Sequence, residues 1–432
     1  MKILQYPGKD QWTGLCKRPV QENAEIGKTV LGIINEVKIS GDKALLRYAE
    51  LFDGAALSDL EVTKEEISAA GNEIPAELSD AIRRAKSNIE KFHSAQLVSE
   101  PVIETSAGVR CWRKSVPIEK VGLYIPGGSA PLFSTLLMLA IPAKIAGSNE
   151  IVVCTPAGKD GKISPVILFT AELMGINRIF KCGGAQAVAA MAYGTESVPK
   201  VYKIFGPGNQ YVTKAKELVL LDGIAIDMPA GPSEVLVIAD KTADASFVAA
   251  DLLAQAEHGP DSQVILATES SEILENVKSE ISFQASKLPR KNLLVRSLEH
   301  ARLLLFATLD ECVEFSNLYA PEHLIINTEN AGALAEKVTN AGSVFIGPYS
   351  CESMGDYASG TNHTLPTNSF ARNYSGLSTE SFLKKITFQE ITGNGIADLG
   401  PAVEIMAEAE QLEGHRNSVS VRLKKLKSFT IS

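Results

Sequence analysis

The sequence contains six cysteines in 432 residues, and no two of them form a C-x-x-C pair. Cysteines scattered so widely in a long chain do not indicate a disulfide framework or a cysteine-ligated zinc site. Residues 1–25 also lack the continuous apolar stretch of a signal peptide. We therefore expect a cytoplasmic protein in a reducing compartment.

Basic charge is also scarce, because 42 Lys and Arg stand against 51 Asp and Glu, giving a net charge of −9. Nucleic-acid binding without sequence preference needs clustered basic charge, so no nucleic-acid partner is expected. An uncharged run covers residues 121–143, but Pro126, Gly127 and Pro142 interrupt it. It is predicted to be a strand, a turn and a buried helix, so no membrane partner is expected.

The sequence has neither a G-x-G-x-x-G fingerprint nor a G-x-x-x-x-G-K-[ST] phosphate loop. Strand-like and helix-like segments nevertheless alternate, with glycine turns at Gly183-Gly184 and Gly206–Asn209 and a further turn at Pro126–Ser129. The predicted strands are 121–125, 151–154, 178–181 and 202–205, and the predicted helices are 131–146, 165–174, 186–193 and 210–221. This order favours a parallel sheet that binds ligands beyond the carboxyl ends of its strands. Turns that lead into helix N-termini suit a phosphate-bearing cofactor.

A second α/β series is predicted from strands at 235–238 and 263–267 and helices at 243–257 and 271–288. The first hundred residues and the tail after about Thr379 are predicted to be mainly helical. At roughly 150 residues per domain, the length suggests about three domains.

Histidine is rare, and five of the six histidines lie from His258 onward. Gln255 and His258 are three residues apart near the end of a predicted helix, so they share a face and could contact one metal ion. A helix-end histidine bonded to a backbone carbonyl is the alternative. Glu322 and His323 are adjacent within Ala-Pro-Glu-His-Leu. This pair suits proton transfer near neutral pH, although a surface turn has the same composition.

The segment from Gly355 to His363 is rich in glycine and polar residues and includes Asp356. Flanking prolines predict an irregular loop, which could carry a site or could be a plain turn cluster. Glu410 and His415 are five residues apart, so their spacing alone says little. Ser233 follows a Gly-Pro turn and could lie beside a ligand.

Together these segments resemble the histidinol dehydrogenase family from roughly Tyr124 to His415. The strings that carry the resemblance are YIPGGSAP at 124–131, GGAQ at 183–186, FGPGN at 205–209, DMPAGPSE at 227–234, QAEHGP at 255–260, APEHL at 320–324, GDYASGTNH at 355–363 and EGH at 413–415. One departure is Cys351, at a position where the family often has proline.

The resemblance implies a cytoplasmic enzyme that oxidises L-histidinol to L-histidine through L-histidinaldehyde, with Zn²⁺ and two NAD. It implies Glu322 and His323 as the acid–base residues. The implied zinc ligands are Gln255, His258, Asp356 and His415, the last from a second subunit of a homodimer. The implied substrate contacts are these four ligands together with Ser233, His323, His363 and Glu410. The implied NAD contacts are Tyr124, Gln186 and Asn209.

The implied fold is α/β, with two incomplete Rossmann-like parallel-sheet domains and small helical terminal extensions that take part in dimer formation. The implied domains are residues 1–21, residues 22–123 with 235–377, residues 124–234, and residues 378–432. Two other interpretations of these residues as a functional site stay open. A zinc-dependent hydrolase could use the same metal ligands and Glu-His pair. A non-catalytic small-molecule binder could use the same scaffold.

Overall fold

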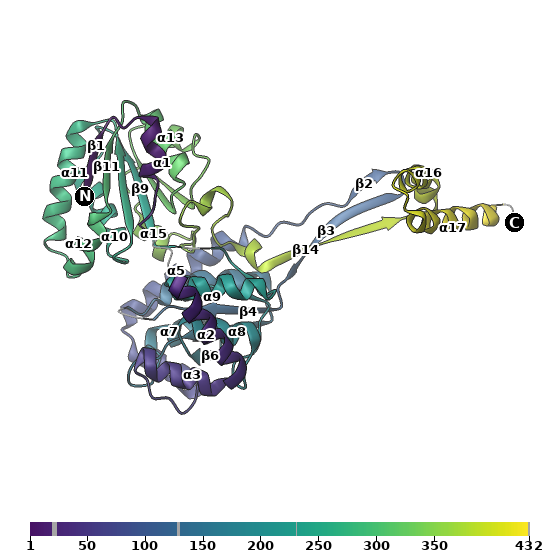
Figure 1. Ribbon diagram of the computed structural model, residues 1–432, viewed down its shortest axis with the longest axis horizontal. Coiled ribbons are helices and arrows are strands. Elements are labelled where there is room, and N and C mark those ends of the chain that lie inside the picture. The colour runs from purple at the N-terminus through teal and green to yellow at the C-terminus, as the bar shows by residue number, and fades with distance from the viewer. Residues whose placement is uncertain (20–23, 128–129, 230, 431–432) are drawn as a thin grey trace. The chain divides into compact units, whose positions relative to one another are not determined.

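The computed structural model describes residues 1–19, 24–127, 130–229 and 231–430, and the chain forms two compact units (Figure 1). The first unit comprises Met1–Gln96 and Ile118–Phe382. The second comprises Leu97–Pro117 and Leu383–Ser432. Each unit is therefore discontinuous in the sequence.

The first unit contains a six-stranded sheet in which all neighbouring strands are parallel. Its strand order is β1 (Lys2–Gln5), β11 (Arg302–Leu305), β10 (Gln263–Thr268), β9 (Glu234–Ala239), β12 (His323–Asn327) and β13 (Ser343–Ile346). The edge strand β1 was missed from the sequence, which predicted a mainly helical N-terminal region. Its four residues are too few to show a period against the helices that follow.

Alternate residues of β9 face opposite sides of this sheet, because successive side chains of a strand point in opposite directions. Val235 and Val237 belong to a core with α10 (Ala245–Ala256), α11 (Ser271–Ala285) and α12 (Lys291–Glu299). Leu236 and Ile238 belong to a core with α1 (Lys9–Leu15), α13 (Leu309–Tyr319) and α14 (Ala331–Ala335). Burial on both faces explains the continuous apolar run of this strand.

A second parallel sheet in the same unit has five strands. Its order is β6 (Ile179–Lys181), β5 (Glu150–Thr155), β4 (Lys120–Tyr124), β7 (Lys203–Phe205) and β8 (Ala225–Ile226). One core joins it to α2 (Ala24–Ser40), α3 (Asp42–Tyr48), α8 (Gly184–Tyr193) and α9 (Gln210–Leu221). The helix α6 (Phe133–Ala146) packs on β4, α5 (Ala76–Ser94) and α7 (Pro165–Leu173). The predicted α/β alternation is confirmed.

The strand order of both sheets reverses beside a central strand. In the five-stranded sheet the chain runs from β4 outward to β6 and then returns to β7, on the other side of β4. In the six-stranded sheet it runs from β9 outward to β11 and returns to β12, on the other side of β9. Such reversals open crevices in which ligands bind. The pairs β4–β7 and β9–β12 are therefore the places to look for sites.

The second unit is an antiparallel sheet of β14 (Leu383–Ile391), β3 (Val109–Pro117) and β2 (Ile103–Ser106), with two helices that pack on each other. These helices are α16 (Gly393–Ala409) and α17 (Glu413–Thr430). The prediction that the tail is helical from Thr379 was wrong for β14. Pairing with β3, including stacked Phe388 and Trp112 rings 5.5 Å apart, decides the structure of this segment.

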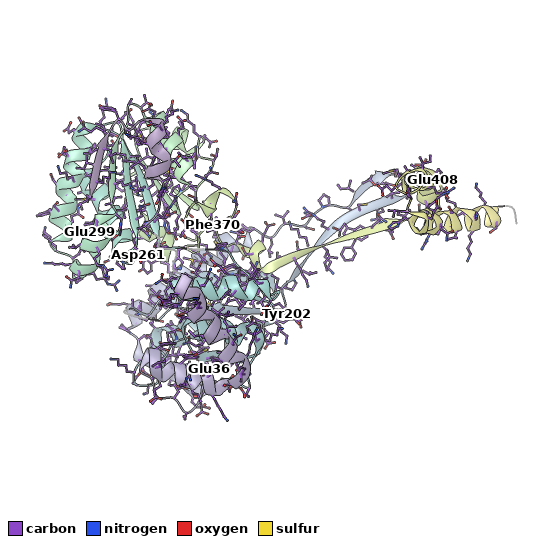
Figure 2. The ribbon with its side chains drawn as sticks, viewed as in Figure 1. Glu36, Tyr202, Asp261, Glu299, Phe370 and Glu408 are labelled. Carbon is purple, nitrogen blue, oxygen red and sulfur yellow. The ribbon has the colours of Figure 1, made fainter. Side chains whose placement is uncertain are left out.

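Exposed charged side chains occur on helices of both units. Figure 2 labels Glu299 at the end of α12 and Glu408 on α16, and both side chains are exposed. Among the described residues, no helix combines the length and the apolar character needed to cross a membrane.

Candidate functional site

Glu322 and His323 lie where β12 begins. The preceding helix α13 ends at Tyr319, and Ala320 turns the chain with a left-handed φ of 53°. Glu322 is 6% exposed and His323 is 3% exposed, so these residues do not form a surface turn. The Glu322 Oε2 atom accepts a hydrogen bond from the backbone N–H of Glu234 at 2.9 Å. The two catalytic candidates are thus held against the first residue of β9.

The His323 ring lies between polar groups on both sides. Its Nδ1 is 3.4 Å from the Glu234 carbonyl oxygen and 3.6 Å from Glu322 Oε2. Its Nε2 lies 3.5 Å from Asp356 Oδ1 and has no hydrogen-bond partner among the described residues. A buried Nε2 without a hydrogen-bond partner is suited to exchange a proton with a ligand.

The pKa values of both members of this pair are raised, for different reasons. Burial raises the pKa of Glu322 to about 8. Burial lowers the pKa of His323, but the carboxylates of Glu352, Glu322 and Asp356 outweigh it and raise this pKa to about 10. Glu322 and His323 therefore hold protons more tightly than the isolated side chains do.

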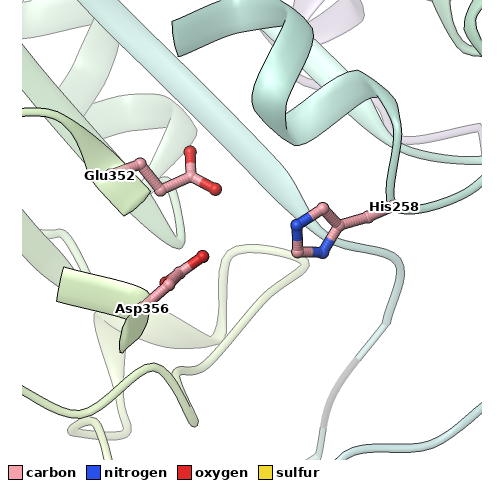
Figure 3. A group of neighbouring side chains, drawn as sticks. All are labelled: His258, Glu352 and Asp356. Atoms are coloured by element: carbon pink, nitrogen blue, oxygen red, sulfur yellow. The ribbon is translucent and has the colours of Figure 1, made fainter. Parts of the chain in front are cut away.

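A cluster that fits a divalent cation lies beside the pair. His258, Glu352 and Asp356 each offer a ligand atom, and these atoms lie within 4.8 Å of one another (Figure 3). Glu352 and Asp356 are on the short helix α15 (Glu352–Tyr357), four residues apart, so they share its face. One imidazole nitrogen and two carboxylate oxygens are donors that zinc accepts. Glu352 is only 1% exposed, and a cation would compensate its buried charge.

Two expectations about this cluster change. The segment around Asp356 was predicted to be an irregular loop, but Asp356 lies in α15, whose buried residues Glu352 and Gly355 pack this turn inward. Glu352 was missed, although its spacing of four residues from Asp356 is a signal that the sequence contained. Cys351 is the N-cap of α15 with a φ of −75°, a value that proline also adopts. Cysteine in place of the proline that the family often has here is therefore compatible with the same backbone conformation.

Gln255 lies on α10 next to this cluster and is completely buried. Its amide is satisfied when the nitrogen donates to Glu352 Oε2 at 3.0 Å and the oxygen accepts from the Glu234 N–H at 3.1 Å. Gln255 therefore joins α15 to the first residue of β9. Ser233 immediately precedes Glu234, and its carbonyl accepts from the Gln263 N–H at 3.1 Å. Ala230, in the same motif, lies outside the described residues.

His363 reaches the same region from the segment after α15. Its Nδ1 is 2.9 Å from the backbone oxygen of Asp356, and its Nε2 is 3.3 Å from the Thr135 hydroxyl. The neighbouring Asn362 donates to the Met138 carbonyl at 2.7 Å and contacts buried His93 at 3.3 Å. This segment therefore packs on α6, which follows β4 of the other sheet.

Glu410 and His415 lie in the second unit. Glu410 is the C-cap of α16, and His415 is in the first turn of α17, where its N–H donates to the Leu412 carbonyl at 3.0 Å. Both side chains are exposed. Their partnership with Gln255, His258 and Asp356 stays a prediction.

Tyr124, Gln186 and Asn209 line one cavity of about 1440 Å³. It opens where β4 and β7 end and where α8 and α9 begin. The Tyr124 hydroxyl accepts from the Gly184 N–H at 3.1 Å, and burial raises its pKa to about 12. Asn209 caps α9 by accepting from the N–H groups of Tyr211 and Val212 at 3.0 and 3.2 Å.

Glycine is needed in the turn beside this cavity. A Cβ atom on Gly183 would lie 2.7 Å from Pro156, so a larger residue would displace the turn. Gln186 is buried, and its Oε1 lacks a hydrogen-bond partner in the part of the chain that the structure describes. The turn predicted at Pro126–Ser129 lies partly outside the described residues. The sequence-predicted cofactor residues are thus brought together in one cavity.

Comparison with known proteins identifies the fold and its relatives. The family model for histidinol dehydrogenase matches residues 16–423. A histidinol dehydrogenase of Bacteroides thetaiotaomicron is 59% identical over 99% of this chain and its own whole length. One from Campylobacter jejuni is 52% identical over 99% of this chain and all of its own.

A solved structure gives the same result. The crystal structure of histidinol dehydrogenase from Elizabethkingia anophelis matches with a TM-score of 0.97, 54% identity and 99% coverage of both chains. The resemblance drawn from the sequence motifs is confirmed. The chain belongs to the histidinol dehydrogenase family of NAD-dependent oxidoreductases.

Proposed function

We propose that this protein oxidises L-histidinol to L-histidine through L-histidinaldehyde, as the last step of histidine biosynthesis. The overall oxidation removes four electrons and uses two NAD. The observation that carries the proposal is the buried Glu322–His323 pair beside the cluster of His258, Glu352 and Asp356, in a chain of this family. Zinc is the proposed metal, because imidazole and carboxylate donors suit it.

The proposed zinc ligands are Gln255, His258, Asp356 and the partner's His415. When bound, zinc supplies a Lewis acid that anchors the imidazole and amino nitrogens of the substrate. Gln255 touches Glu352 and the backbone of Glu234, so this ligand connects the metal region to the catalytic pair.

His323 is the proposed base that takes the proton of the substrate hydroxyl. Bound NAD supplies the acceptor for hydride in each oxidation. His323 needs a neutral ring for this task, whereas acidic neighbours raise its pKa to about 10. Neutralising Asp356 and Glu352 with a cation would return the imidazole to its base form.

Glu322 is the proposed base for the second oxidation. Its carboxylate is buried and close to His323, so it can take a proton from the water that adds to the aldehyde. Tyr124, Gln186 and Asn209 are proposed to contact NAD in their shared cavity. Ser233, His363 and Glu410 are proposed further contacts of the substrate, whose cationic groups suit a carboxylate.

We also propose a cytoplasmic homodimer, because the resemblance takes one metal ligand from the second copy. The segments at both ends, 1–21 and 378–432, are proposed to take part in dimer formation. The α/β domains 22–123 with 235–377 and 124–234 stay a prediction, although α2 and α3, within 22–123, share a core with the five-stranded sheet.

The decisive experiment incubates zinc-loaded protein with L-histidinol and NAD and measures NADH absorbance and histidine. We expect two NADH for each histidine. Absence of NADH with fully zinc-loaded protein contradicts the proposal. Light scattering tests the dimer, and an active monomer contradicts a shared site.

A further inference from the structure

Arg18 is a buried cation that the proposed mechanism does not use. It follows α1 in the N-terminal segment, and 5% of its side chain is exposed. Its guanidinium binds the Glu234 carboxylate with two hydrogen bonds, from Nε to Oε2 at 2.7 Å and from Nη2 to Oε1 at 2.8 Å. The Glu234 side chain is 1% exposed. This is the bidentate geometry that only arginine provides.

The remaining donors of Arg18 are also satisfied. Nη1 donates to the Cys16 carbonyl at 3.0 Å and to the Ser369 hydroxyl at 2.6 Å, and Nη2 donates to the Tyr319 carbonyl at 2.8 Å. All five N–H groups of a guanidinium therefore have an acceptor. The guanidinium also lies over the Tyr319 ring, 3.6 Å from its centroid. One side chain thus fixes segments from four parts of the sequence.

Two of these segments hold the catalytic pair. Glu234 is the first residue of β9, and its N–H donates to Glu322 Oε2 while its carbonyl oxygen faces His323 Nδ1. Tyr319 ends α13, three residues before Glu322, and its hydroxyl donates to Glu234 Oε2 at 3.1 Å. The Arg18–Glu234 pair therefore contacts both the first residue of β9 and Tyr319, which ends the helix before β12.

The backbone of Glu234 also selects a state of His323. The Asp356 carboxylate, 3.5 Å from Nε2, is a proposed zinc ligand and would be engaged by the metal in the loaded protein. The Glu234 carbonyl oxygen, 3.4 Å from Nδ1, then favours a hydrogen on Nδ1, which leaves the lone pair of the neutral ring on Nε2. Nε2 is the buried nitrogen without a hydrogen-bond partner among the described residues. A tilt of β9 would move the Glu234 carbonyl away from Nδ1 and weaken the preference for the Nδ1–H tautomer. It would also move the Glu322 carboxylate, which accepts from the Glu234 N–H.

We propose that Arg18 and Glu234 are positioning residues for the Glu322–His323 pair: their ion pair sets the backbone of Glu234, which fixes the Glu322 carboxylate and the Nδ1–H tautomer of His323. The mechanistic part rests on the proposed function. A buried ion pair adds little net stability compared with apolar packing, so stability alone does not require it. Breaking it leaves an unpaired buried charge, so the test must separate misfolding from mispositioning.

The test uses zinc-loaded protein with Arg18→Lys, Arg18→Ala and a double variant Arg18→Met/Glu234→Met that leaves no unpaired charge. Lys9→Met is the matched control, because Lys9 forms an exposed ion pair with Glu314 on the same N-terminal segment. Folding is checked by circular dichroism and thermal unfolding. We expect kcat to fall about 100-fold in Arg18→Ala and in the double variant, with the KM for NAD unchanged, because a small misplacement of catalytic groups has this effect.

Two readouts separate positioning from a structural role. Guanidinium in solution is expected to restore kcat in Arg18→Ala at least tenfold, whereas ammonium at the same concentration is not. Nitrogen NMR of histidine-labelled protein reports the tautomer without any turnover, and the six histidines keep the spectrum simple. His323, assigned from the signal lost in His323→Asn, is expected to be the Nδ1–H form in wild type and mixed in the folded double variant.

A folded double variant with an unchanged His323 tautomer and wild-type kcat overturns the proposal. A variant that loses only thermal stability, with kcat per folded molecule unchanged, also overturns it. If the wild-type protein did not oxidise histidinol, the proposed function would fail, yet the NMR comparison would still decide whether Arg18 and Glu234 set the His323 ring.

Discussion

The two parallel sheets of the first unit differ in which ends of their strands lie at the candidate site. In the five-stranded sheet, the cavity lies at the carboxyl ends of β4 and β7, lined by glycines, prolines and Asn209. In the six-stranded sheet, Glu234 and His323 are the first residues of β9 and β12, so the catalytic candidates lie at the amino ends. The carboxyl-end rule therefore applies to the cavity and not to the catalytic pair.

The difference follows from what each end offers. Carboxyl ends lead into helix N-termini, whose free N–H groups suit phosphates, and Asn209 caps one such helix. The amino ends of the strands lie beside the C-termini of helices. Gln255 is near the end of α10, and Glu322 lies three residues after the end of α13. One sheet thus supplies space and backbone donors, and the other supplies buried groups that exchange protons. The comparison predicts that changes at one sheet leave the function of the other intact.

The largest effect is expected for His323→Asn. Loss of the proposed base should lower kcat by about 10²- to 10⁴-fold, the range typical of general base catalysis. NAD affinity, measured by calorimetry, should stay within twofold because the cavity belongs to the other sheet. His300→Asn, at the C-cap of α12, is the control and should change neither quantity. A large loss of NAD affinity in His323→Asn would contradict the separation.

The next effect concerns the metal. Asp356→Asn should lower zinc affinity by at least about tenfold, because a charged ligand is replaced by a neutral amide. Metal analysis after dialysis against a weak chelator measures this without turnover. Asp310→Asn removes a carboxylate of which 72% is exposed, and should retain zinc. Full zinc occupancy in folded Asp356→Asn would remove Asp356 from the ligand set.

Asn209→Ala tests the other sheet with a matched partner, Asp244→Ala. Asn209 caps α9, and Asp244 caps α10 by accepting from the Ser246 N–H at 2.8 Å. Each variant should lose about 1 kcal/mol of unfolding free energy, as cap removal does. Only Asn209→Ala should weaken NAD binding, several-fold, with kcat at saturating NAD unchanged. Equal NAD affinities in the two variants would contradict a contact between Asn209 and NAD.

The smallest effect is expected for Asp53, which lines the cavity. Burial raises the pKa of its carboxyl to about 6, so the folded state binds a proton more tightly than the unfolded chain. Ionisation therefore costs stability as the pH rises through 6, and the cost is absent below about pH 4. Asp53→Asn should be more stable at pH 8 by at most about 1 kcal/mol, since the group is partly screened by solvent.

Denaturant titrations at pH 8 and pH 4.5 check this, and the gain should shrink at the lower pH. Asp59→Asn, an exposed carboxylate on the following loop, serves as the comparison and should show no such dependence. A gain of equal size at both pH values would show that ionisation of Asp53 is not its source.

The sequence predicted the parts of the fold that repeat with a clear period. The strands and helices between 121 and 221 are confirmed, because short apolar strands that alternate with glycine turns and helices leave few alternatives. The strand β14 was missed, since its structure depends on pairing with β3, more than 260 residues earlier. Local patterns do not encode partners at that distance.

The site shows the same limit. Tyr124, Gln186 and Asn209 were predicted from motifs and do meet in one cavity. Glu352 was not predicted, because a carboxylate is usually exposed and only the packing of α15 buries it. The pairing of Arg18 with Glu234 was also missed, as the two residues are 216 residues apart and share no local motif. Buried charges are recognised only when the structure shows their partners.

The contacts of Arg18 have a consequence for how the protein is made. Its partners Glu234, Tyr319 and Ser369 follow it by 216, 301 and 351 residues. At a synthesis rate of about 5 to 20 residues per second, Ser369 is made about 20 to 70 s after Arg18. The N-terminal segment therefore leaves the ribosome before the acceptors of the Arg18 guanidinium on Glu234, Tyr319 and Ser369 have been synthesised. Catalytic competence is acquired late in synthesis, after the cavity of the five-stranded sheet has all of its strands.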